Sequence, residues 1–407
     1  MTVGTPGFVA GRLTEARQAF GLTKVALAEM INVSPMAISQ YESGPQTPRP
    51  DVMDRLSEKL GFPRSFFLSQ PWSEDNDDPT FWRSNASATQ IARERCHPRL
   101  RWLKEITSYQ REFLDFPKLE LPPIRAPEDF RTLTSAQIEH IAQECRDWWN
   151  FGSGPIPDLL LELENSGVIT ARINVAAESL DAFSQWSSSF RIPFVVLGKD
   201  KASAVRSRFD AAHELAHLLL HRRVDRRRVR NTADWKVLEQ QAHRFAAALL
   251  LPAKSFVDEL WAPTLDGMLS RKERWRVSIG MMIVRCEHIG LINQDQARRL
   301  WINYNRRGWR GEEPLDAVLN SEQPRVLRRG FEALIENKIR TKGEIVAELC
   351  LPAREIEELA ALPRGYFSGN DADVKAFPRL KSQTEGVPSS NNDGAEIISL
   401  VDRKKPS

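Results

Sequence analysis

The segment SRFDAAHELAHLLLH, residues 207–221, constrains the fold more than any other part of this 407-residue chain. His213 and His217 are four residues apart, so on a helix they lie on one face and can bind the same metal ion. Glu214 lies beside them, where its carboxylate can take a proton from water activated by that metal. Apolar side chains fill most of the remaining positions, among them Ala212, Ala216 and Leu219. We therefore expect a helix with a buried apolar side and a metal-binding face.

A catalytic zinc site needs a third protein ligand and an open position. His221 is eight residues after His213, a separation of ~12 Å along a helix, which is too far for both side chains to bind one ion. The next expected helix, residues 236–250, offers Glu239 and His243, which are again four residues apart. The spacing alone does not show whether Glu239 or His243 is the ligand. Asp210, one helical turn before His213, is a further candidate to orient a ligand imidazole.

The N-terminal part, residues 8–68, has the capping pattern of several short helices. Thr23 and Ser34 precede two of them, and Pro35 stands at the first position of the second. Two short helices joined by a tight turn allow the second helix to enter the major groove of DNA. Lys24 could then hold a phosphate, and the side chains near the start of the second helix could meet base edges. The expected base-contacting residues are Ser34, Met36, Ala37, Ser39 and Gln40.

The charge of this N-terminal part leaves an alternative open. Residues 1–70 contain seven Lys and Arg and six Asp and Glu, a net charge near +1, and the whole chain has a formal net charge of only +3. DNA affinity depends strongly on phosphate neutralisation, so the same helices could instead contact only protein. An arginine-rich run at 222–230 is either a patch for nucleic acid or an acidic substrate, or a solvated loop.

The remaining composition excludes several other classes of protein. The four cysteines are widely spaced, with no CxxC pair, which argues against a disulfide framework and against a cysteine zinc site. The sequence has no apolar run of the length needed to span a membrane and no N-terminal secretion signal. We therefore expect a cytoplasmic protein with no membrane partner.

The fold class expected from these patterns is mainly α with a small β-sheet, an α+β arrangement. Two short β-like runs occur at 168–173 and 192–197. The second is either an edge strand on which an extended substrate could pair or a strand with a purely structural place in a sheet. Residues 80–116 read as helix. The expected divisions are a helix-turn-helix domain at 1–68, a linker and helical connector at 69–129, a zinc-peptidase-like domain at 130–300, a helical C-terminal region at 301–377, and a disordered tail at 378–407.

Two resemblances to known families follow from these motifs. RLTEAR, GLTKVALAEMINVSPMAISQYESG and TPRP resemble the phage-repressor-like (XRE) helix-turn-helix family, although Lys24 stands where that family often has Gln. RSRFDAAHELAHLLLH, followed by LEQQAHRFAAALLLP, resembles the ImmA/IrrE metallo-endopeptidases. The second resemblance implies that Glu239 is the third ligand of one catalytic Zn²⁺. His243 stands where Asn or Asp is frequent, so its relation to the metal stays open.

The resemblances also imply a function. They describe a zinc-dependent endopeptidase, with Glu214 as general base, fused to a sequence-specific DNA-binding module. The implied substrate is a protein, in particular a transcriptional repressor cut in stress or mobile-element control. The alternative is a DNA-binding regulator or an antitoxin-like protein whose peptidase-like domain senses or binds a partner with little turnover. Because helix-turn-helix proteins read paired half-sites, we also expect a homodimer.

Overall fold

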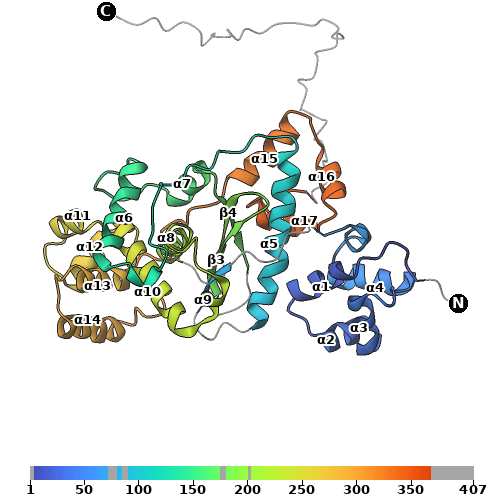
Figure 1. Cartoon of the computed structure of the whole chain (residues 1–407), viewed down its shortest axis with the longest axis horizontal. Helices are drawn as coiled ribbons and strands as arrows, with labels where there is room; N and C mark the ends of the chain where they lie inside the picture. Colours follow the sequence, from blue (N-terminus) through green and yellow to red (C-terminus); the bar gives the residue numbers. More distant parts are fainter. Residues whose placement is uncertain (1–3, 72–79, 85–89, 175–179, 200–202, 368–407) are drawn as a thin grey trace, which may run out of the picture. The chain divides into compact units, whose positions relative to one another are not determined.

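The computed structural model describes residues 4–71, 80–84, 90–174, 180–199 and 203–367 (Figure 1). These residues form many helices and one four-stranded sheet, which confirms the expected α+β class. The acidic part of the expected linker and the expected disordered tail lie outside the described residues. Within the described residues, no helix combines the length and the apolar character needed to cross a bilayer.

The N-terminal helices follow the caps expected from the sequence. The side chain of Thr23 accepts a hydrogen bond from the Ala26 amide, and that of Ser34 accepts one from the Ala37 amide, each at 3.1 Å. Gly44 ends the third helix with a φ of 90°, a conformation that glycine adopts without strain. The elements are α1 (Ala10–Ala19), α2 (Lys24–Met30), α3 (Pro35–Ser43), α4 (Pro50–Leu60) and the short 3-10 helix η1 (Arg64–Leu68).

The next segment begins as a strand. Residues 80–116 read as helix in the sequence, but the structure has β1 (Thr80–Ser84) before α5 (Gln90–Arg111). The expectation was wrong for β1 because its conformation is set by antiparallel pairing with β3 (Leu180–Ser187), about a hundred residues later in the chain. Such a tertiary pairing leaves no local periodicity for sequence reasoning to find.

The sheet has the strand order β1-β3-β4-β2, in which β2 is Ile169–Ile173 and β4 is Ile192–Gly198. β2 and β4 are parallel, and the other two pairs are antiparallel. β4 therefore lies between two strands, so of the two alternatives for residues 192–197 the edge strand is wrong and the strand within the sheet is right. Its residues 192–197 are all buried, as befits a strand covered on both faces.

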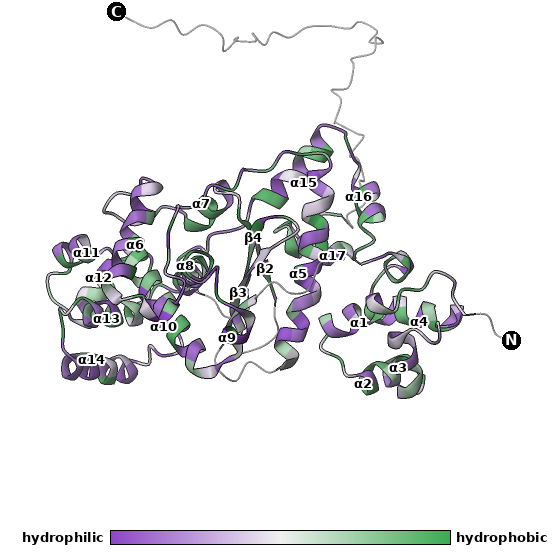
Figure 2. Ribbon diagram, in the orientation of Figure 1, coloured by the Kyte–Doolittle hydropathy of each residue, from purple (hydrophilic) through white to green (hydrophobic). Residues whose placement is uncertain are grey.

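Alternate side chains of the strands enter two different cores. Val195 and Leu197 of β4 belong to a core with α6 (Ser135–Trp148), α8 (Ala204–Leu220) and α10 (Thr232–Leu250). Phe194 and Val196 belong to a second core, to which α5, the N-terminal helices and the last helices contribute. Figure 2 shows hydrophobic residues in the sheet and α8, whereas α14 (Gln294–Arg306) is largely hydrophilic. The other helices are η2 (Phe130–Thr132), α7 (Leu159–Asn165), α9 (Arg226–Arg230), α11 (Ala253–Glu259), α12 (Leu265–Trp275), α13 (Ile279–His288), α15 (Val326–Glu336), α16 (Lys342–Leu349) and α17 (Ala353–Leu359).

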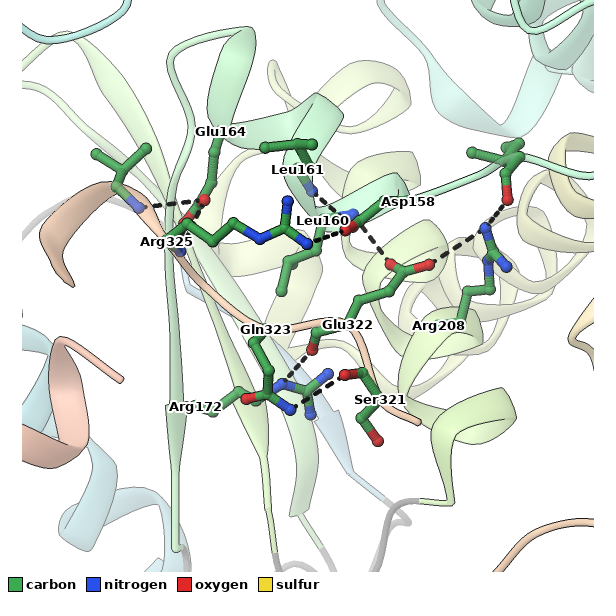
Figure 3. Close-up of polar contacts among 12 residues, drawn as sticks. Asp158, Leu160, Leu161, Glu164, Arg172, Arg208, Ser321, Glu322, Gln323 and Arg325 are labelled. Atoms are coloured by element: carbon green, nitrogen blue, oxygen red, sulfur yellow. Dashed lines mark hydrogen bonds and ion pairs between the residues drawn. The ribbon is translucent and has the colours of Figure 1, made fainter. Parts of the chain in front are cut away.

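A polar network anchors the segment 321–326, which leads into α15 (Figure 3). The backbone carbonyl of Glu322 accepts a hydrogen bond from Arg172 of β2 at 2.9 Å. Its carboxylate accepts one from the Leu160 amide of α7 at 3.0 Å and pairs with Arg208 of α8 at 3.2 Å. These contacts fix the path by which the chain leaves the helices around α8 and reaches the opposite face of the sheet.

Candidate metal centre

Helix α8 presents His213, Glu214 and His217 from the interior of the protein. All three side chains are fully buried, and every residue from 210 to 220 is buried as well. Small residues such as Ala212 of α8 and Ala246 of α10 lie in the core shared by these two helices. Because small side chains let helix backbones approach closely, α10 can bring Glu239 over the histidine face of α8.

Three donor atoms from these helices converge. The Nε2 atoms of His213 and His217 are 3.1 Å apart, and Glu239 Oε1 lies 3.5 Å and 3.2 Å from them, respectively. Tetrahedral ligands with zinc bonds near 2.1 Å are separated by about 3.4 Å. Two imidazole nitrogens and one carboxylate oxygen are also the donor types that zinc accepts. The three residues therefore fit a zinc ion in both spacing and chemistry.

His243 and Asp210 lie close to this cluster. His243 is exposed, its ring centroid is 4.7 Å from that of His213, and ligand atoms of His213, Glu239 and His243 lie within 4.8 Å of one another. The His213 ring is no nearer to that of His217, with centroids 4.8 Å apart, so His243 is a further candidate ligand of the same centre. Asp210 is buried one turn before His213 on α8.

The charge of Glu239 is favoured by its neighbours. Burial alone would raise the pKa of this carboxyl, but the hydrogen bonds and charges of His213 and His217 outweigh it and hold the pKa well below its usual range. Glu239 is therefore an anion at neutral pH, which is the form that binds a cation.

Behind His217 runs a chain of hydrogen bonds that sequence reasoning did not predict. His217 Nδ1 is 2.8 Å from His221 Nδ1, and His221 Nε2 is 3.0 Å from Gln241 Oε1. Gln241 in turn donates to the carbonyl of Phe130 at 2.7 Å. Burial, followed by the charge of His217, lowers the pKa of His221 to about 3, so this imidazole is neutral.

These hydrogen bonds set the tautomers of His217 and His221. A neutral His221 donates a hydrogen bond from Nε2 to the Gln241 oxygen. The Nδ1 atom of His221 is then free of hydrogen and accepts a hydrogen bond from His217 Nδ1. When His217 is neutral, which is the form that binds a metal, its Nε2 lone pair then points toward Glu239 and His213. His221 therefore lies behind His217, as its eight-residue separation from His213 led us to expect. The repeat of the four-residue spacing from His217 to His221 was the signal that could have revealed the orienting role.

The carboxylate of Glu214 receives a hydrogen bond from a strand. Ser184 of β3 donates from its hydroxyl to Glu214 Oε2 at 2.5 Å, and both residues are fully buried. The sequence around Ser184 contains no motif that marks it, because the contact joins a strand and a helix thirty residues apart. The bond leaves the carboxylate oriented by β3.

Residues 163–287 match the IrrE N-terminal-like domain of peptidase family M78. This match includes α8 and α10, and it confirms the resemblance noted in the sequence. Residues 13–67 match the helix-turn-helix family model. A search of curated proteins found no match to the chain.

The M78 match supports a metallopeptidase-like domain that uses a metal ion and acts on protein. Next to its candidate centre lies a cavity of about 1130 Å³. His243 and Phe209 line the cavity on the side of the centre. Basic and aromatic side chains line much of the rest, namely Arg131, Arg206, Arg244, Trp301, Trp309 and Arg310.

The helix-turn-helix match supports DNA binding. At the start of α3, Ser34 is exposed and Met36 is 67% exposed, whereas Ala37, Ser39 and Gln40 are half-buried. Lys24 reaches across from α2, with its Nζ 3.3 Å from Ser39 Oγ. The same Nζ is 3.5 Å from a carboxylate oxygen of Glu42, which partly offsets its positive charge.

Proposed function

We propose that this chain is a zinc-dependent endopeptidase fused to a sequence-specific DNA-binding module. One observation carries the proposal. Two imidazole nitrogens and one carboxylate oxygen, from His213, His217 and Glu239, lie within 3.5 Å of one another beside the buried carboxylate of Glu214. That combination of three ligands and a general base is what metal-assisted peptide hydrolysis requires.

In this proposal Glu214 moves the protons of the reaction. Its carboxylate takes a proton from the attacking water and returns it to the leaving amine, while the Ser184 hydroxyl keeps the carboxylate oriented. His213, His217 and Glu239 would hold the metal, and His221 holds His217 in the tautomer that binds it. When bound, zinc supplies Lewis-acid polarisation of the peptide carbonyl and makes water acidic enough to attack near neutral pH.

The Glu214→Gln variant tests the catalytic part of this proposal. We expect hydrolysis of an unfolded protein such as casein to fall by about 10²–10⁴-fold, because the amide cannot accept the proton. Zinc content measured by atomic absorption should stay at one ion per chain. Glu336→Gln, an exposed glutamate on α15, is the matched control and should retain full activity. Equal rates for both variants would refute Glu214 as the general base.

We propose further that the protein substrate is a transcriptional repressor. The support is the fusion of a peptidase-like domain to a DNA-binding module in one chain. Glu214→Gln protein should trap an uncleaved repressor in a pull-down, and the same repressor should be cut by the unmodified protein. A trapped partner that stays intact with active protein would instead favour a regulator that binds partners without turnover.

For the DNA-binding module, we propose that α3 enters the major groove and that Gln40 contacts a base. The preferred site can be selected from a random oligonucleotide pool. Gln40→Ala should then weaken binding to that site by roughly 10-fold, while binding to unrelated DNA stays unchanged. Gln46→Ala, an exposed glutamine beyond α3, is the matched control. Equal loss on both kinds of DNA would argue against base recognition by Gln40.

A further inference from the structure

Strand β1 lies along the sheet edge nearest the catalytic carboxylate. It pairs antiparallel with β3, and in that register Phe81 is the partner of Ser184. Ser184 is the residue whose hydroxyl donates to Glu214. The backbone of β1 therefore passes directly beside the strand that orients the general base, and it uses the hydrogen-bonding edge of β3.

The side chain of Phe81 fills an aromatic pocket over a metal-binding histidine. Its ring stacks on the His217 imidazole, with centroids 4.7 Å apart and planes inclined by 13°. It is only 1% exposed and shares a small core with Phe130, Val224 and Leu238, against which Trp235 packs. The residues around Phe81 thus form an apolar pocket shaped for a planar ring.

An extended peptide and β1 would compete for the hydrogen-bonding edge of β3 and for the pocket that holds Phe81. Peptides that add to a sheet edge bind through main-chain hydrogen bonds and place alternate side chains in pockets, which is how β1 is held. β1 has five residues, and its register with β3 shifts between Arg83 and Ser84. A register shift disrupts the ladder locally, so β1 holds this edge less regularly than an unbroken strand of the same length would.

We propose that β1 occupies the place of an extended peptide substrate, and that it blocks the peptidase site until such a peptide displaces it. The pocket around Phe81 is then a specificity site that accepts an aromatic side chain of that peptide. This proposal rests on the proposed endopeptidase function, since it assigns the same site a substrate class and a means of control.

The first experiment measures peptide binding without cleavage. A fluorescein-labelled ten-residue peptide with one central Phe is titrated into zinc-loaded Glu214→Gln protein, and its anisotropy is followed. Phe81→Ala in that background empties the pocket, so we expect the dissociation constant to fall at least 10-fold. A peptide with Ala in place of Phe should gain much less. Phe113→Ala, which removes a half-buried ring just after α5, is the matched control.

A second experiment holds β1 in place in case Phe81→Ala protein does not fold. Thr80 and Gln185 are partners in the register, and their side chains are joined by a 2.8 Å hydrogen bond. Thr80→Cys/Gln185→Cys protein should therefore form a disulfide that ties β1 to β3. We expect the oxidised form to bind the labelled peptide at least 10-fold more weakly than the form reduced with a phosphine, whereas each single cysteine variant should show no redox effect.

The outcomes separate this proposal from the proposed function. Equal peptide binding by the oxidised and reduced double variant, or no gain for folded Phe81→Ala protein, would overturn the blocking role of β1. Glu214-dependent casein hydrolysis would still stand in that case. Conversely, if binding responds as expected but no protein hydrolyses casein, the strand competition is supported and the endopeptidase function fails.

Discussion

At the scale of single residues, His217 has polar partners at both ring nitrogens and an aromatic ring stacked on one face. Its Nε2 faces His213 and Glu239, its Nδ1 faces His221, and Phe81 stacks on its ring. An imidazole held in this way loses little freedom when it binds a metal, so the affinity of the site depends on residues that do not themselves touch the ion.

We predict that His221→Phe lowers zinc affinity by about 10–100-fold, because His217 Nδ1 loses its hydrogen-bond partner and the favoured tautomer is no longer fixed. Competition with a chromogenic chelator measures the affinity. His140→Phe, which replaces an exposed histidine of α6, should bind zinc normally. If both variants bind zinc as well as the unmodified protein does, His221 has no orienting role.

A second residue-scale prediction concerns Lys104 of α5. Its ammonium is buried beside the Phe194 ring and donates to Gln185, and burial lowers its pKa from 10.5 to about 8. Since the pKa is lower in the folded state, the unfolded chain binds more protons between pH 8 and 10.5. Stability should therefore rise with pH across that window, by at most about 3 kcal/mol.

Urea unfolding at several pH values tests this sign. The rise should disappear in Lys104→Met, because that side chain does not titrate, and it should persist in Lys254→Met, which changes an exposed lysine of α11. A stability difference between Lys104→Met and the unmodified protein that stays constant from pH 8 to 10.5 would show that the buried ammonium is not responsible.

At the scale of elements, the segment 321–326 depends on a buried acid. Glu322 pairs with Arg208, whose side chain is only 2% exposed, and accepts from the Leu160 amide (Figure 3). Glu322→Ala leaves this guanidinium without its carboxylate, and breaking a buried pair costs about 3–5 kcal/mol. We expect a loss of that size in urea unfolding, against no change for Glu336→Ala. A loss below about 1 kcal/mol would mean that water replaces the carboxylate.

The helices and strands differ in how well the sequence predicts them. The caps at Thr23 and Ser34 located α2 and α3 because a cap is a local interaction, and the runs at 168–173 and 192–197 located β2 and β4 because continuous apolar residues mark buried strands. β1 was not predicted because its pairing partner, β3, is about a hundred residues away. β3 was not predicted although it forms a local hairpin with β4, because the polar residues Asp181, Ser184 and Gln185 interrupt its apolar pattern. Ser184 and Phe81 lie on these two strands, so their relation to Glu214 and His217 could not be predicted either.

At the scale of the whole molecule, α5 belongs to the same core as both the helix-turn-helix and the sheet. Trp102 is fully buried, its ring lies 5.5 Å from Phe62 and 6.0 Å from Phe66, and its indole donates to Glu15 of α1 at 3.3 Å. Arg12 of α1 also pairs with Glu105 of α5 at 2.8 Å. The same core continues to Phe194 on the sheet.

We predict that Trp102→Ala destabilises the N-terminal helices and the sheet together, by about 3–5 kcal/mol, because the cavity opens in their common core. Hydrogen exchange followed by mass spectrometry should show faster exchange in α1–α4 and in β2–β4. Trp148→Ala, which removes a half-exposed ring of α6, should change neither. Faster exchange confined to α1–α4 would contradict a cooperative core.

The shared core has a consequence for engineering chimaeras. A new DNA specificity is commonly installed by exchanging the helix-turn-helix between related regulators, with the cut placed just after its last helix. Here a cut after η1 would remove Phe62 and Phe66, which pack against Trp102, and would expose the Trp102 ring to solvent. The junction should instead follow α5, so that the incoming module brings its own complementary helix surface, or the graft must keep the aromatic residues that α5 contacts.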